Sequence, residues 1–148
     1  MTADLGLVRR LVLGDNGLVV ISTPRPDNSV HSSVVNAGVC DDPITGEPTV
    51  GMVLRGGVRK LDLLRRNGFA TVTFRVGRQW ASVDGPARII GPDDPEPGFD
   101  QAGLPALLRT IFTAAGGTHG DFDEYDRVMA AERRTAVFVA PQRIISNG

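Results

Sequence analysis

Six β-rich segments separated by turn-forming residues constrain the fold of this chain more than any other feature of its sequence. The clearest are residues 69–76 and 79–90, in which apolar and polar side chains alternate on either side of Gly77-Arg78. An alternation with a period of two is typical of a strand with one buried face, and a short glycine-containing connection joins antiparallel neighbours. These segments therefore predict a long β-hairpin.

Four other segments complete the predicted strands. Residues 18–23 and 31–39 flank Pro24, Pro26 and Asp27-Asn28, which are typical turn residues, so a second antiparallel hairpin is expected there. The two remaining predicted strands cover residues 49–54 and 135–145.

The helices predicted between these strands are short. We expect them over residues 4–14, 58–66, 105–115 and 121–132. Asn67-Gly68 supplies a left-handed cap for the second helix, and Asp121 with Glu124 has the spacing of a capping box for the fourth. The resulting fold class is mainly β, a six-stranded antiparallel barrel with short helical insertions, in one domain over residues 1–148.

Composition narrows the function classes. The 148 residues are 41% hydrophobic, with a net charge near −1 and a sequence pI of about 6.1, which argues against a general nucleic-acid or membrane-surface binder. The N-terminal residues lack the charged and apolar regions of a signal peptide, and no apolar run reaches ~18 residues. We therefore expect a cytoplasmic protein.

Residues for metal binding or for acid, base and nucleophilic catalysis are scarce. His31 and His119 are the only histidines and lie far apart, so no metal site is expected, and Cys40 is most simply a small apolar residue at a strand end. There is no nucleophile elbow, P-loop or dinucleotide-binding fingerprint. If the chain is an enzyme, a cofactor performs the reaction.

The strongest functional signal is a cationic segment at residues 55–66, which carries five positive charges, including Lys60, the only lysine. Gly56-Gly57 precedes the predicted helix, so Arg59 and Lys60 fall in its first turn. The helix dipole disfavours cations there by ~0.3–1 kcal/mol each. Glycines, free N–H groups and cations at a helix start together favour a bound phosphate or carboxylate.

The order of these motifs resembles the flavin and deazaflavin oxidoreductases of the pyridoxamine-phosphate-oxidase-like split β-barrel. The similarity rests on a first hairpin at 23–27 and 31–35, the segment 59–66, and the strand pair around 78–80 and 85–88. Late segments are similar to the branch that binds the deazaflavin coenzyme F420, namely 115–119, 123–125, 129–130 and 132–134. The resemblance implies an FMN-binding type of split barrel that forms a homodimer, with the cofactor cleft between two subunits.

The resemblance also assigns cofactor contacts. Lys60 would bind the cofactor phosphate, helped by Arg59 and by the loop of Arg55, Gly56 and Gly57. Residues beside the ring or under the ribityl chain would be Ser32, Ser33, Val34, Val35, Asn36, Leu54, Gln79 and Trp80. The strand residues would contact the ring largely through backbone groups.

Two departures from the family pattern bear on the cofactor. Phosphate-oxidase members commonly have Ser where Val58 stands and Arg near the position of Ser32, and each lost charge-assisted bond removes ~1.5–3 kcal/mol of phosphate binding. Arg55, Arg65 and Arg66 instead suit a longer anion, such as the phosphodiester and glutamate tail of coenzyme F420. Arg65 and Arg66 could equally complement the end of their helix.

The leading hypothesis is therefore an F420-dependent oxidoreductase that transfers hydride to an unsaturated small organic acceptor. An FMN-dependent oxidase or reductase is the second possibility, and a non-catalytic flavin-, deazaflavin- or haem-binding protein is the third. Single residues also have structural interpretations: Trp80 as barrel-rim packing, Tyr125 and Met129 as core, His119 as a loop residue, and Asp84 as a hairpin or bulge residue and not a general acid.

Overall fold

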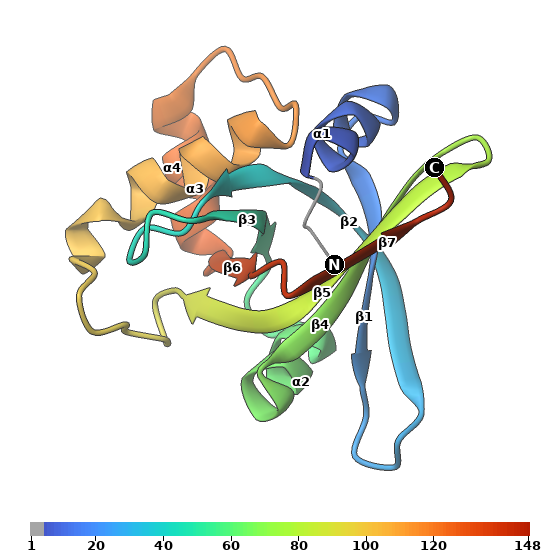
Figure 1. The fold of residues 1–148 in the computed structure, drawn as a ribbon. Coiled ribbons are helices and arrows are strands. Elements are labelled where there is room, and N and C mark those ends of the chain that lie inside the picture. The colour runs from blue at the N-terminus through green and yellow to red at the C-terminus, as the bar shows by residue number, and fades with distance from the viewer. Residues whose placement is uncertain (1–4) are drawn as a thin grey trace.

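A computed structural model describes residues 5–148 of the chain (Figure 1). Its helices are α1 (Leu5–Gly14), α2 (Arg59–Asn67), the 3₁₀ turn η1 (Gln101–Gly103), α3 (Leu104–Ala114) and α4 (Phe122–Ala131). Its strands are β1 (Leu18–Pro24), β2 (Val30–Asp41), β3 (Pro48–Leu54), β4 (Phe69–Val76), β5 (Gln79–Ile90), β6 (Thr135–Val139) and β7 (Arg143–Ser146).

Six of these strands close into an antiparallel barrel. The order is β4-β1-β2-β3-β6-β5, and β5 pairs again with β4, which closes the ring. Closure leaves no unpaired edge along most of the sheet. The mainly β, six-stranded antiparallel barrel predicted from the sequence is confirmed.

The prediction of one continuous strand over 135–145 is wrong. The chain breaks around Pro141, which has no N–H to donate to a sheet, and β6 and β7 pair with different halves of β5. Gly85 lies at the junction, where a side-chain Cβ would fall 1.6 Å from the carbonyl oxygen of Ala140. Only a glycine lets the two chains approach so closely. Figure 1 shows β7 running beside β5 after this break.

The predicted cap of α2 is confirmed, but of the capping box predicted for α4 only the Asp121 half is present within residues 5–148. Gly68 ends α2 in the left-handed conformation, with φ of 66°, and its N–H donates to Leu64. Asp121 caps α4 by accepting hydrogen bonds from the backbone N–H groups of Asp123 and Glu124. The N–H of Asp121 itself donates to Nδ1 of His119 at 3.0 Å. The predicted start of the first helix at residue 4 lies outside the described residues.

Two apolar clusters form the core. One fills the barrel and contains Phe74 and Met52, and the other lies under α3 and α4 around Ile111 and Phe138. The helices α3 and α4 lie together on one side of the barrel, where α3 packs against β2, β3 and β6 (Figure 1). We call α3 and α4, together with the residues that directly follow each of them, the helical wall. The wall lies beside β2 and β3, and β3 leads into α2.

Two classes of site are absent from the described part of the chain. None of the helices within residues 5–148 has the length and apolar character needed to cross a bilayer. Over the same range, no group of three or more His, Cys, Asp and Glu side chains is arranged to hold a metal ion.

Candidate cofactor-binding site

A pocket of about 400 Å³ lies where β2, the end of β3 and the start of α2 meet the helical wall. We call it the cofactor pocket. The barrel and α2 contribute Val34, Val35, Asn36, Val53, Leu54, Arg55, Val58 and Lys60, and the wall contributes Ile111, Phe112, Ala115, Tyr125, Met129 and Arg134. Its volume is within the usual range of small-molecule sites, about 300–1,000 Å³.

The two glycines between β3 and α2 shape one edge of this pocket. The N–H of Gly56 donates to the carbonyl oxygen of Glu132 at 3.0 Å, and a Cβ at Gly56 would lie 2.8 Å from Cβ of Arg133. Gly57 has a φ of 84°, which side chains rarely tolerate. The loop therefore lies against the turn after α4 and brings the first turn of α2 to the pocket edge.

Positive charge at this edge is unpaired. Arg55 and Lys60 line the pocket, and neither has an ion-pair or hydrogen-bond partner within residues 5–148. No side chain caps the N-terminus of α2 at Val58, and Asp62 in the first turn is paired with Arg65 at 3.1 Å. Burial lowers the pKa of Lys60. Unpaired cations beside an uncapped helix start fit an anionic group.

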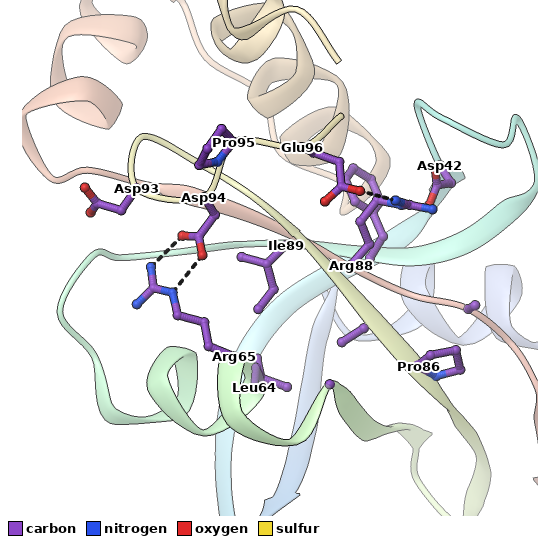
Figure 2. Close-up of a pocket in the computed structure, with 14 residues that line it drawn as sticks. Asp42, Leu64, Arg65, Pro86, Arg88, Ile89, Asp93, Asp94, Pro95 and Glu96 are labelled. Atoms are coloured by element: carbon purple, nitrogen blue, oxygen red, sulfur yellow. Dashed lines mark hydrogen bonds and ion pairs between the residues drawn. The ribbon is translucent and has the colours of Figure 1, made fainter. Parts of the chain in front are cut away.

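A larger opening on another face of the molecule differs in that its cations are paired with carboxylates. This ion-pair groove, of about 720 Å³, runs between α2, β5 and the loop after β5. Figure 2 shows Arg65 pointing at Asp94, with which it makes two hydrogen bonds of 2.9 and 2.6 Å. Arg88 lies between Asp42 and Glu96 at 2.7 and 2.8 Å (Figure 2). Its cations already have carboxylate partners, so the groove is a weaker candidate for an anion.

The helical wall is apolar and its polar atoms are mostly occupied. Tyr125 is buried, its hydroxyl donates to the carbonyl oxygen of Leu108 at 3.2 Å, and burial raises its pKa. Its ring lies 4.9 Å from the ring of Phe112. Arg134 is held by Glu132 at 2.8 Å. The pocket thus has an unpaired cationic edge and an apolar, aromatic wall, which is the distribution that a planar ring with an anionic tail requires.

Comparisons with known proteins identify the architecture. No protein-family model matches the sequence, and no curated protein is recognisably similar. Among solved structures, a conserved hypothetical protein from Mycobacterium tuberculosis matches with a TM-score of 0.68 at 15% identity, over 99% of this chain and 85% of that one. A pyridoxamine 5'-phosphate oxidase-related, FMN-binding protein from Nostoc punctiforme matches with 0.68 at 12% identity, over 99% and 85%. The fold is the pyridoxamine-phosphate-oxidase-like split β-barrel.

A third solved structure that is similar to this chain is an F420 reductase, which matches with a TM-score of 0.60 at 14% identity, over 90% of this chain and 93% of that one. The resemblance inferred from the sequence is therefore confirmed for the architecture. At such identities the likeness establishes the fold, and the residues of this split barrel must carry any argument about chemistry.

Part of the predicted site comes together in this split barrel. Of the predicted cofactor-binding residues, the pocket lining includes Val34, Val35, Asn36, Leu54, Arg55 and Lys60. Gly56 and Gly57 form the adjoining loop, and Arg59 is exposed in the first turn of α2. Arg65 does not extend a cationic track along the pocket, because it faces the ion-pair groove.

Four predicted residues lie apart from the pocket lining. Ser32 is exposed on β2 and shares a hydrogen bond with Ser22, while the Ser33 hydroxyl is buried without a partner among the described residues. Gln79 and Trp80 begin β5, where Trp80 is paired with Arg75 across the hairpin and its backbone N–H donates to Oδ1 of Asn147. A cofactor in the pocket would reach Gln79 and Trp80 only if a second copy supplied them.

The helical wall was missed as a site by reasoning from sequence. Tyr125 and Met129 were interpreted as core, and Tyr125 is indeed buried, but both also line the pocket. Ile111 and Phe112 come about one turn before Gly116-Gly117, which ends the helix. Their apolar spacing predicts a buried helix face, but it does not predict which part of the molecule that face contacts. The segments 115–119, 123–125, 129–130 and 132–134, which are similar to the F420-binding branch, were the only indication in the sequence that this region belongs to the site.

The remaining ionisable candidates have structural roles. Cys40 is buried, and burial raises its pKa to about 11, which keeps the thiol protonated at neutral pH. Asp84 accepts hydrogen bonds from Thr71 at 2.7 Å and Arg143 at 2.5 Å, which ties β4, β5 and β7 together. His119 is a loop residue, as expected, and its ring lies 5.8 Å from that of Tyr125.

Proposed function

We propose that this protein binds the deazaflavin coenzyme F420 in the cofactor pocket and reduces an unsaturated small organic acceptor. The observation that carries the proposal is that Arg55 and Lys60, which have no carboxylate partner within residues 5–148, lie beside the uncapped start of α2. When bound, the coenzyme would supply the hydride. The chain's own contribution would be to hold the anionic tail at Lys60 and to fix the ring against β2 and the wall.

FMN is the second candidate, and the FMN-binding neighbour of the same fold favours it. Val58 at the N-cap of α2 weighs against it, since valine offers no hydroxyl to a compact phosphate monoester. Among the residues that the structure describes, the pocket lining also contains no carboxylate or histidine to act as a proton donor. A non-catalytic carrier therefore remains the third candidate.

Titration of the purified protein with F420 and, separately, with FMN tests the proposal. We expect saturable quenching of Trp80 fluorescence or a ligand absorbance shift, with tighter binding of F420 than of FMN. The reduced coenzyme, mixed with acceptors that contain a C=C bond conjugated to a carbonyl group, should then be oxidised in step with acceptor loss. Binding of FMN alone would favour the second candidate, and F420 binding without turnover would favour the carrier.

We also propose that two copies pair beside the pocket. Leu18, Val20 and Val34 are exposed by 42%, 38% and 63% on the outward face of β1 and β2, where Val20 lies opposite Val34. Val34 also lines the cofactor pocket, so a copy packed on this face would cover the pocket and could bring its own Gln79 and Trp80 to it.

Light scattering after size exclusion tests the pairing. The unmodified chain is expected to be a dimer and Val20→Glu a monomer, because the substitution places a charge in an apolar contact. Val128→Glu is the matched control, since Val128 has a similar exposure of 42% but lies on α4, outside the β1 and β2 face and outside the pocket lining. A monomeric unmodified chain at micromolar concentration would contradict the proposal.

A further inference from the structure

A second, smaller cavity of about 210 Å³ lies between α3 and α4. We call it the α3–α4 cavity. Met129 and Arg134 line both this cavity and the cofactor pocket, so the two spaces share a wall. Nothing in the proposed coenzyme contacts requires this second space.

The two spaces follow one another along the same pair of helices. On α3, Leu104 and Leu108 line the cavity, and Ile111, one turn later, lines the pocket. On α4, Ala130 lines the cavity and Met129 lines both. Methionine is unbranched and has three rotatable side-chain bonds, so a rotamer change at Met129 can open a passage between them.

The charged groups at the edge of the cavity are neutralised by partners. Asp126 is bound to Arg109 at 2.5 Å, Arg134 to Glu132 at 2.8 Å, and Arg133 to Asp93. All three charged residues among its described lining are therefore paired, whereas the cofactor pocket has Lys60 and Arg55 unpaired. The α3–α4 cavity suits a neutral, apolar group.

We infer that the α3–α4 cavity is the subsite for the apolar tail of an elongated, neutral acceptor. The tail would lie between Leu104, Leu108 and Ala130, and the reducible end would pass Met129 into the cofactor pocket beside Phe112. The placement of the reducible end in the cofactor pocket rests on the proposed function, but the assignment of the tail subsite does not. The substrate class is thus an unsaturated molecule with an alkyl or similarly apolar extension.

The neutral fluorescent probe N-phenyl-1-naphthylamine and primary alcohols of increasing length test this subsite. The unmodified protein should bind the probe, and alcohols should displace it with affinities that rise about fourfold for each added CH₂ until the cavity is full. Ala130→Trp should weaken binding of the probe and of the longer alcohols at least tenfold, because the indole fills the cavity. Met129→Ala should move the chain-length limit to longer alcohols.

Ala131→Trp is the matched control, since Ala131 is the next residue on α4, is exposed like Ala130, and lies outside the lining. It should leave probe binding unchanged, and circular dichroism should show both tryptophan variants folded. Equal probe affinity in Ala130→Trp and the unmodified protein would overturn the inference, as would displacement independent of chain length.

Coenzyme titrations of the same proteins separate this inference from the proposed function. Ala130→Trp should keep its F420 affinity, and Lys60→Ala should keep its probe affinity. If the unmodified protein fails to bind F420 while the chain-length dependence holds, the proposed function fails and the tail subsite stands. If F420 binds and Ala130→Trp leaves the probe unaffected, the subsite fails alone.

Discussion

Asp42 is a buried charge and Lys60 a partly buried one, and their surroundings in the protein are opposite. Asp42 accepts hydrogen bonds from Arg88 and from the N–H groups of Ile44 and Thr45. Burial alone would raise the pKa of Asp42, but these bonds outweigh it and lower the pKa. Lys60 has no such hydrogen bond or ion pair within residues 5–148, and burial lowers its pKa. A charge left uncompensated in the fold is more readily explained by a ligand than by stability.

Asp42 gives a residue-scale prediction for stability against pH. Its folded pKa lies below the ordinary value of 3.8, so its stabilising contribution is present above pH 3.8 and is lost as the pH falls through the folded pKa. Asp42→Asn should therefore cost about 1–3 kcal/mol at pH 7, and the difference should shrink below pH 3.8. Urea unfolding at pH 7 and pH 3 measures it.

Asp41→Asn is the control, because Asp41 is exposed and is not among the carboxylates that bind Arg88 within residues 5–148, which are Asp42 and Glu96. It should unfold like the unmodified chain at both values of pH. A cost for Asp42→Asn that does not diminish in acid would show that its carboxylate charge is not the source of the stability.

At the scale of elements, local patterns determined most of the fold. Alternation over 69–76 and 79–90 predicted β4 and β5, and Asn67-Gly68 predicted the end of α2, because these signals depend only on neighbours in sequence. The break between β6 and β7 has a local signal in Pro141 that the prediction of one strand over 135–145 passed over, whereas the close approach of Gly85 to Ala140 at the same place depends on a distant segment. A contact between segments far apart in the chain has no local signature.

Gly85 gives the element-scale prediction. Gly85→Ala should destabilise the fold by about 3 kcal/mol, because its Cβ would overlap the carbonyl oxygen of Ala140, which is backbone and cannot rotate away. Chemical denaturation measures the loss. Gly120→Ala should stay within about 0.5 kcal/mol of the unmodified chain, since nothing lies within 4 Å of a Cβ there. Equal stability of the two variants would contradict this account of the β6–β7 break.

At the scale of the whole molecule, the site is made where four separate segments meet. The sequence indicated the segment around Lys60 because glycines and cations at a helix start have a local physical meaning. It could not indicate that Phe112 and Met129 face that segment, since their apolar spacing is that of any buried helix face. Gln79 and Trp80 lie outside the lining within one chain, so their predicted role depends on a second copy.

The most direct test of the central claim is the affinity of Lys60→Ala for F420, compared with that of Arg66→Ala. Arg66 is exposed later on the same helix and does not line the pocket. If Lys60 holds the anionic tail, its removal should weaken binding about ten- to a hundredfold, as expected for one charge-assisted hydrogen bond, while Arg66→Ala should bind within about twofold of the unmodified protein. Equal affinities for Lys60→Ala and the unmodified protein would contradict the account.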